Sequence, residues 1–195
     1  MNALDNYYKS SLLAGLCGEY KNMWQGARHD KGKLISLAMS QQSIPHLATF
    51  AYEGKGMTKE CFKEEFADYI NGTVIKNSDG VEGYTYALYV DYDYDNEILV
   101  DKDVIHVMWT NDAILSVPTS KCPIIYISNK SKVSLSCEGF NTVKVYLFDE
   151  SEIELYDVDE TCTVTVLKYS DNTKVTRGKY CFSDDIHCFA KELKL

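Results

Sequence analysis

Hydrophobic residues recur at intervals of nine to eleven positions between residues 113 and 176. The recurring positions are Leu115, Ile125, Leu135, Val145, Leu155, Val166 and Val175. Each lies in a short run in which apolar and polar residues alternate, and Asn, Asp, Ser and Gly separate the runs. Alternation with a period of two predicts β-strands, and the separating residues favour tight turns between them.

Two β architectures are compatible with this pattern. The steady interval favours a short β-solenoid, in which each run forms one side of a coil and stacks on the next coil. An antiparallel meander or sandwich is the alternative, since its strands are also about 8–12 residues apart. The turns here also lack an Asn or Gly at one fixed place. A solenoid is expected to bury Val133, Val143, Ile153 and Val164 and to expose Ser134, Lys144, Glu154 and Thr165. About six runs predict roughly three coils.

The N-terminal part of the chain carries the pattern of helices instead. Apolar residues four positions apart predict a helix over residues 3–26. Ser43 and Thr58 precede two later helical segments as N-cap residues, and Asn71-Gly72 ends the last of them. We therefore expect an α+β protein with a helical domain over residues 1–72.

The periodicity changes to two at Thr73. Tyrosine and aspartate are frequent in the alternating run from Tyr84 to Asp95, and a turn there is predicted to lead into a partner strand from Ile98. Residues 73–103 are therefore expected to form a β-hairpin connector. Residues 104–195 then form the repetitive β-domain.

The connector carries the predicted interaction surface. The chain has 15 tyrosines, and a tyrosine-rich strand face is a typical contact surface. The residues assigned to this surface are Tyr84, Tyr86, Tyr89, Asp91, Asp93 and Asp95. The aspartates are similar to the start of a calcium-binding loop. Because Lys102 stands where that loop has its bidentate Glu, an acidic hairpin tip is favoured.

The charge and the cysteines restrict the partners and the compartment. With a net charge of −9 and scattered lysines, the chain is not expected to bind nucleic acid directly. No apolar run approaches the roughly 18 residues of a membrane span, so no membrane association is expected. Seven cysteines without paired spacing, and no secretory leader, predict free thiols in a reducing cytoplasm.

Residues with catalytic or metal-binding chemistry do not form a recognised motif. Cys181, His187 and Cys188 would need a distant fourth ligand to bind zinc, so no metal and no cofactor are expected. Carboxylates of the kind used by β-helical carbohydrate-active enzymes crowd two successive turns: Asp149, Glu150, Glu152, Asp157, Asp159 and Glu160. Those enzymes build a long groove from many more coils, so a non-enzymatic protein is favoured.

Three stretches carry a resemblance to a known family. Residues 6–17 (NYYKSSLLAGLC), residues 54–57 (GKGM) and residues 62–72 resemble an uncharacterised family carried by phages and prophages of gut Bacteroidales. The resemblance covers about residues 4–75, and the acidic Tyr/Asp strand departs from it. It implies a protein of the bacterial host cytoplasm or of the virion, and it supplies no catalytic residues.

These observations predict a non-enzymatic binding or structural protein encoded by a phage or mobile element. As a virion accessory or attachment subunit it would contact a virion or host protein, and association between copies would cover its open coil ends, giving a homo-oligomer. The alternative is an acidic inhibitor of a host defence protein. A carbohydrate-active β-helical enzyme is the second alternative.

Overall fold

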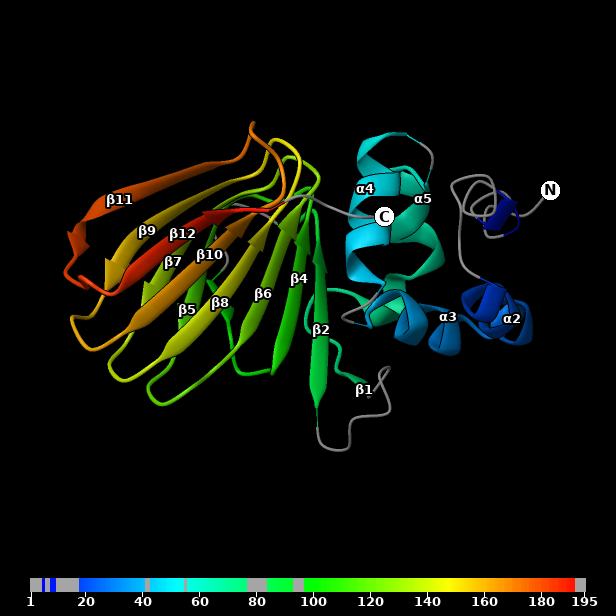
Figure 1. Ribbon diagram of the computed structural model, residues 1–195. Coiled ribbons are helices and arrows are strands. Elements are labelled where there is room, and N and C mark those ends of the chain that lie inside the picture. Colours follow the sequence, from blue (N-terminus) through cyan, green and yellow to red (C-terminus); the bar gives the residue numbers. More distant parts are fainter. Residues whose placement is uncertain are drawn as a thin grey trace.

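The protein consists of N-terminal helices followed by a β-solenoid of about five turns (Figure 1). A computed structural model describes residues 5, 8–9, 18–40, 43–54, 56–76, 84–92 and 97–191. The chain is mostly β, and its helices precede the solenoid, as the sequence predicts.

The helical segment is divided into short elements. They are α2 (Gly18–Ala27), α3 (Lys31–Ala38), α4 (Ile44–Tyr52), α5 (Lys59–Glu65) and the 3₁₀-helix η1 (Ala67–Tyr69). The Thr58 hydroxyl accepts a hydrogen bond from the backbone N–H of Cys61, so Thr58 caps α5 as predicted. Asn71 and Gly72 take left-handed φ angles of 55° and 104°, which end the helical segment. Most of residues 3–17 of the first predicted helix lie outside the described residues.

Twelve strands follow in the described part of the chain. They are β1 (Ile75–Lys76), β2 (Thr85–Val90), β3 (Glu97–Leu99), β4 (Val104–Met108), β5 (Asn111–Val117), β6 (Ile124–Ser128), β7 (Lys132–Cys137), β8 (Thr142–Leu147), β9 (Glu152–Val158), β10 (Thr163–Lys168), β11 (Lys174–Cys181) and β12 (Ile186–Ala190). One sheet has the order β1-β2-β4-β6-β8-β10-β12 and the other β11-β9-β7-β5-β3. All pairs are parallel except β1–β2. The solenoid is therefore confirmed over the antiparallel meander.

Each coil contributes one strand to each sheet, which explains the ten-residue rhythm. Leu115 pairs with Leu135, and Leu135 with Leu155, in the five-stranded sheet. Ile125 pairs with Val145 in the seven-stranded sheet. Apolar positions ten residues apart thus face each other across the coil, and positions about twenty apart stack along it. The predicted count of roughly three coils is too low, because β2, β3 and β12 also belong to the solenoid.

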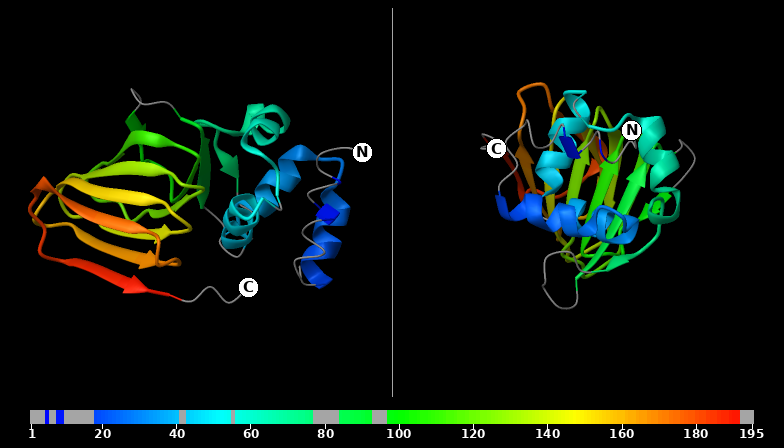
Figure 2. Two further views of the ribbon diagram at one scale, coloured as in Figure 1. Left: turned by 90° about the horizontal axis from the view of Figure 1, so that it is seen from above. Right: turned by 90° about the vertical axis from the view of Figure 1, so that its right-hand side faces the viewer.

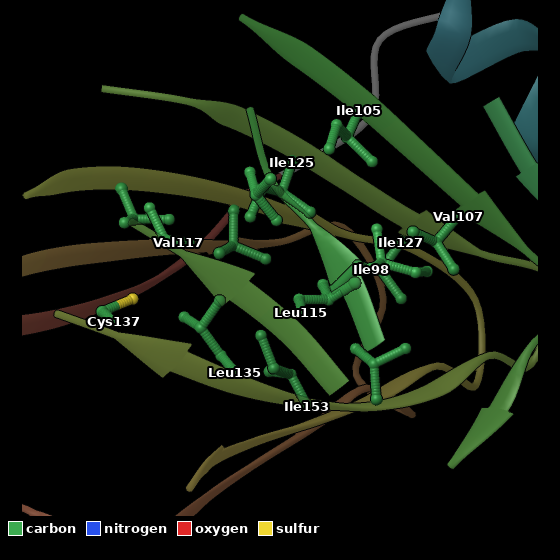
Figure 3. Close-up of a cluster of buried hydrophobic side chains, with 14 of the residues drawn as sticks. Ile98, Ile105, Val107, Leu115, Val117, Ile125, Ile127, Leu135, Cys137 and Ile153 are labelled. Atoms are coloured by element: carbon green, nitrogen blue, oxygen red, sulfur yellow. The ribbon is translucent and has the colours of Figure 1, made fainter. Parts of the chain in front are cut away.

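The interior of the coil is a continuous apolar core (Figure 3). Val133, Val143, Ile153 and Val164 all point into it and are at most 4% exposed, as the alternation predicts. The intervening side chains of Ser134, Lys144, Glu154 and Thr165 are exposed or half-buried. Figure 3 shows Ile105, Ile125, Leu115 and Leu135 converging from the two sheets.

The strand predicted from Ile98 does not pair with the Tyr-rich strand β2, whose antiparallel partner within residues 73–103 is β1. β2 and β3 lie in different sheets, where β2 pairs with β4 and β3 pairs with β5. These strands form the first coil of the solenoid. The pairing was not predictable because β2 is buried on both faces. Such a strand lacks the apolar and polar alternation that would show which face lies in the coil.

The helices cover the outer face of the seven-stranded sheet near its β2 end (Figure 2). A second apolar cluster joins them to this face: Leu34, Ile44, Leu47 and Phe62 pack with Tyr86, Leu88, Val104, Met108, Tyr126 and Phe148. A strand such as β4 therefore has one face in the coil and the other beneath the helices. The outer face of the five-stranded sheet carries no described helix.

Candidate ligand-binding groove

The predicted interaction surface does not exist in the form expected. Tyr86 and Tyr89 are 0% and 7% exposed, because the helices cover one and the coil interior encloses the other. Tyr84 is exposed, and Asp91 is half-buried between two lysines. Asp93 and Asp95 lie outside the described residues. The tyrosines of this strand therefore serve mainly as core residues.

The carboxylates considered for catalysis are separated by the strand β9. Asp149, Glu150 and Glu152 lie at its start, and Asp157, Asp159 and Glu160 at its end. The seven residues of β9 span about 20 Å at the rise of an extended strand. The two groups thus lie at opposite ends of one coil and do not line a common cleft.

Histidine and cysteine side chains do not gather into a metal site in the described part of the chain. His187 instead contacts Asp185, with Nε2 2.7 Å from the carboxylate. Cys188 is exposed and Cys181 half-buried as free thiols.

A groove of about 400 Å³ lies where α4 and α5 meet the turns that connect the two sheets. Its lining residues are Tyr52, Lys59, Trp109, Asn111, Asn129, Lys130 and Lys132. Two of them come from the helices and five from two successive coils. The groove therefore depends on how the helices pack against the solenoid, next to β2 and β4 (Figure 1).

Tyr52 forms the helical wall of the groove at the last residue of α4. Its hydroxyl donates a hydrogen bond of 2.9 Å to Glu150 Oε1, and this bond raises the pKa of Tyr52. The Lys130 ammonium lies 5.8 Å from the centre of the ring, within range of a cation–π contact. The ring is thus held in one orientation while 38% of the residue stays exposed.

Lys59 reaches the groove from the first turn of α5 and is held by Asp91. Its ammonium lies 2.9 Å from Asp91 Oδ1, and the Lys63 ammonium lies 2.6 Å from Oδ2. These two hydrogen bonds, first that of Lys63, lower the pKa of the Asp91 carboxyl. Asp91 therefore fixes α5 to the end of β2, and its ion pair with Lys59 partly neutralises the charge of that lysine.

Trp109 supplies the second ring from the turn between β4 and β5. Its φ of 51° is left-handed, which is unusual for a bulky side chain. The corresponding residues of the next two coils are Asn129 and Asp149, with φ of 60° and 50°. Asn and Asp tolerate this conformation well, so Trp109 occupies a backbone position that suits smaller polar residues. Its ring packs 6.3 Å from that of Phe62 in α5.

The floor of the groove is stabilised by buried polar contacts. The Asn129 side-chain amide donates to the Ala48 carbonyl at 3.3 Å, which links the solenoid turn to α4. The Asp149 carboxylate accepts hydrogen bonds from the backbone N–H groups of Asn129, Lys130 and Glu150. Burial raises the pKa of Asp149, and these bonds oppose that shift. The Asp149 carboxylate therefore stabilises the turn through these hydrogen bonds.

Opposite charges alternate across neighbouring coils at the open side. Lys130 lies 3.0 Å from Glu150, and Lys132 lies 3.1 Å from Glu152. Lys132 and Glu152 are directly paired in register in adjacent strands. Exposed pairs of this kind contribute only about 0–1 kcal/mol each to stability, and here they hold the ammonium groups of two residues that line the groove.

The turns on the groove side share a repeated residue type, which is Ser or Thr rather than Asn or Gly. Thr110, Ser131 and Ser151 are buried at intervals of 20 to 21 residues. The Ser131 hydroxyl accepts from the backbone N–H of Thr110, and the Ser151 hydroxyl accepts from that of Ser131, each at 3.1 Å. This hydroxyl ladder satisfies backbone donors that the turns would otherwise leave buried and unpaired. A repeated Ser or Thr thus marks the groove side of the solenoid.

A second open hollow of about 590 Å³ lies between α2, α3 and the segment from η1 to β1. It is mainly apolar, and Met23 and Val74 at its wall are each 46% exposed.

The longest helices in the described ranges are too short or too polar to cross a membrane. No protein-family model, no curated protein and no solved structure matches the chain.

Proposed function

We propose that this chain is a non-enzymatic binding protein, encoded by a phage or mobile element, that serves as an attachment or accessory subunit. The observation that carries the proposal is the groove, where two aromatic rings and several amine and amide groups converge on an open hollow. Sites that combine aromatic walls with a few fixed polar groups are typical of ligand binding. The resemblance of residues 4–75 to a phage-encoded family supports the biological context.

The construction of the groove suits recognition by a preformed surface. The turns that carry Trp109 and Asn129 stand on a coil whose interior residues are almost fully buried. The opposite wall is fixed by the contacts of Tyr52 with Glu150 and of Asn129 with Ala48. A site on rigid elements loses little conformational freedom when a ligand binds, which favours affinity.

The acidic residues of the solenoid support binding rather than hydrolysis. Asp149 accepts backbone hydrogen bonds, and Glu150 is held by Lys130 and Tyr52, whose hydrogen bonds lower its pKa. A general acid at a glycosidic bond needs a raised pKa and a second carboxylate across the scissile bond. Burial does raise the pKa of Asp149, but its oxygens accept backbone hydrogen bonds, and the pKa of Glu150 is lowered, so neither carboxylate is placed for that role.

The test is binding of the purified, fluorescently labelled full chain to cells of gut Bacteroidales, the hosts that the resemblance implies. Tyr52→Ala should reduce the binding at least several-fold, while Tyr156→Ala should leave it unchanged. Tyr156 is a matched control, because it is 42% exposed on β9, away from the groove. Mass spectrometry of purified phage particles should also detect the chain. Equal binding by both variants, or absence from both cells and particles, would refute the proposal.

A further inference from the structure

The polar groups in and beside the groove form a mixed set of hydrogen-bond donors and acceptors. Lys130 stands beside Glu150, and Lys132 beside Glu152, so each ammonium has a carboxylate within 3.1 Å. Asn111 adds an amide, which both donates and accepts. A sugar hydroxyl also donates one hydrogen bond and accepts others. A row of such hydroxyls therefore matches this arrangement better than a ligand with only donors or only acceptors does.

The three lysines that line the groove are each compensated by a neighbouring carboxylate, which weakens their attraction for an anionic ligand. Lys59, Lys130 and Lys132 lie beside Asp91, Glu150 and Glu152 respectively. Asp91 also contacts Lys63, and Glu152 also contacts Lys174. A phosphate would have to compete with these carboxylates for the lysines and would lie close to their negative charge. A cationic ligand would have to compete with the lysines for the carboxylates and would lie close to the positive charge of the lysines. Since each groove lysine already has a carboxylate neighbour, we take the ligand to be neutral, and the anionic sugars of the array test this choice.

The two aromatic rings supply apolar faces beside these polar groups. Tyr52 lies at the end of α4 and Trp109 in the turn before β5, so the rings come from the two different sides of the groove. Aromatic side chains offer a large flat contact area at low cost in conformational freedom. The C–H faces of a pyranose ring pack on such surfaces, while its hydroxyls stay at the ring edge.

The backbone at Trp109 adds a separate argument. A left-handed φ is strained at a bulky residue, and such strained positions cluster at functional sites. Asn129 and Asp149 show that the same turn is formed by residues that tolerate this angle. The strain at Trp109 is offset partly by its contact with Phe62, and it places an indole at the wall of the groove.

From these features we infer that the groove binds a neutral glycan, with pyranose rings against Tyr52 and Trp109 and hydroxyls bonded by Lys130, Lys132 and Asn111. Glu150 positions Tyr52 and Lys130 from beside the groove. This inference rests on the proposed function, because it names the ligand class of the same site. It assigns no cleavage of the glycan.

The test is an array of immobilised neutral oligosaccharides built from hexoses and N-acetylhexosamines, with phosphorylated and sulfated sugars on the same array. The wild-type chain should bind at least one neutral structure. Tyr52→Ala and Trp109→Asn should each weaken that binding by about tenfold or more, the loss expected for one stacked ring. Tyr156→Ala should bind as the wild type does. Trp109→Asn suits the left-handed turn, so circular dichroism should show that it folds.

Glu150→Gln gives a second, independent readout. It removes an acceptor charge and leaves Lys130 without its partner carboxylate, so the groove gains positive charge. This variant should bind the neutral glycan several-fold more weakly and the phosphorylated sugars more strongly than the wild type.

The outcomes separate the ligand class from the function. Binding of only anionic sugars, or of no glycan, would overturn the inference, even if cell binding through Tyr52 persists and the binding function stands. Neutral-glycan binding that Tyr52→Ala and Trp109→Asn leave intact would also overturn it. Release of shortened products from a bound neutral glycan would support the ligand class and refute the non-enzymatic function.

Discussion

His106 is expected to make the stability of this protein fall as the pH drops below 6.5. It lies in β4 beneath the helices and is fully buried. Nε2 is 2.8 Å from the Ser128 hydroxyl, the ring of Tyr126 lies 6.2 Å away, and Nδ1 has no hydrogen-bond partner among the described residues. Burial lowers the pKa of His106 from 6.5 to about 3, because a charged imidazole would lose its hydration at this position.

The size of the effect follows from the linkage between protonation and folding. Because the folded pKa lies below the unfolded one, the unfolded chain binds more protons between about pH 3 and pH 6.5. The stabilising contribution is therefore complete above pH 6.5 and is lost as the pH falls. At pH 5 the loss is about 2 kcal/mol, from 1.5 pH units at about 1.4 kcal/mol per unit.

Urea unfolding of the wild type and of His106→Gln, at several pH values from 7.5 to 5, measures this contribution. Gln can bond to Ser128 without titrating, so the variant should lose about 2 kcal/mol less than the wild type over this interval. Groups that titrate in both proteins, including His46, whose pKa is also lowered by burial, cancel in the difference. His29→Gln, at an exposed position, controls for the loss of a histidine. Parallel curves for wild type and His106→Gln would refute the reasoning.

Three further substitutions test the solenoid itself, each by urea unfolding. Leu135→Ala should cost about 2–5 kcal/mol, because Leu135 is fully buried between paired leucines; a loss below 1 kcal/mol would contradict the packed core. Gly178→Ala should destabilise by about 1–3 kcal/mol, since its Cβ would lie 2.9 Å from the backbone of Tyr156; an unchanged midpoint would contradict this approach. Ser131→Ala should cost about 1–3 kcal/mol and speed hydrogen exchange at the Thr110 amide, and unaltered exchange would argue against the ladder.

The solenoid was predictable because its interior imposes one strict rule on the sequence. Every second residue of a strand enters the coil, so Val143 and Val164 are apolar while Lys144 and Thr165 between such positions are not. The rule holds where the outer face of the strand meets solvent. It fails at β2, where helices cover that face and both sets of side chains are apolar or aromatic. The pattern then shows a strand but does not show which sheet contains it.

The groove was not predictable from local patterns, because its residues are brought together only by the tertiary fold. Tyr52 and Lys59 belong to the helices, whereas Lys130 and Lys132 lie more than seventy positions later in a turn and strand. Each residue, taken alone, has an ordinary structural explanation, as an exposed helix end or a solvated turn. They form a site only because α4 packs on the turn at Asn129, and the hydrophobic periodicity of the sequence does not predict that contact.

The turns on the groove side show how a repetitive fold can carry a specific site. A solenoid repeats its interior, so a change there affects neighbouring coils through the stacked side chains. The hydroxyls of Thr110, Ser131 and Ser151 extend this constraint to the buried part of each turn. Just before each of these hydroxyl residues, the turn has a position whose side chain is free to vary. Trp109, Asn129 and Asp149 occupy this position, and all three have a left-handed φ. Asp149 uses the position to bond the backbone and Asn129 uses it to bond α4, whereas Trp109 presents a ring to the groove. Exchange of Trp109 for Asn should therefore remove binding and leave the coil intact, which is the property expected of a site added to a scaffold rather than required by it.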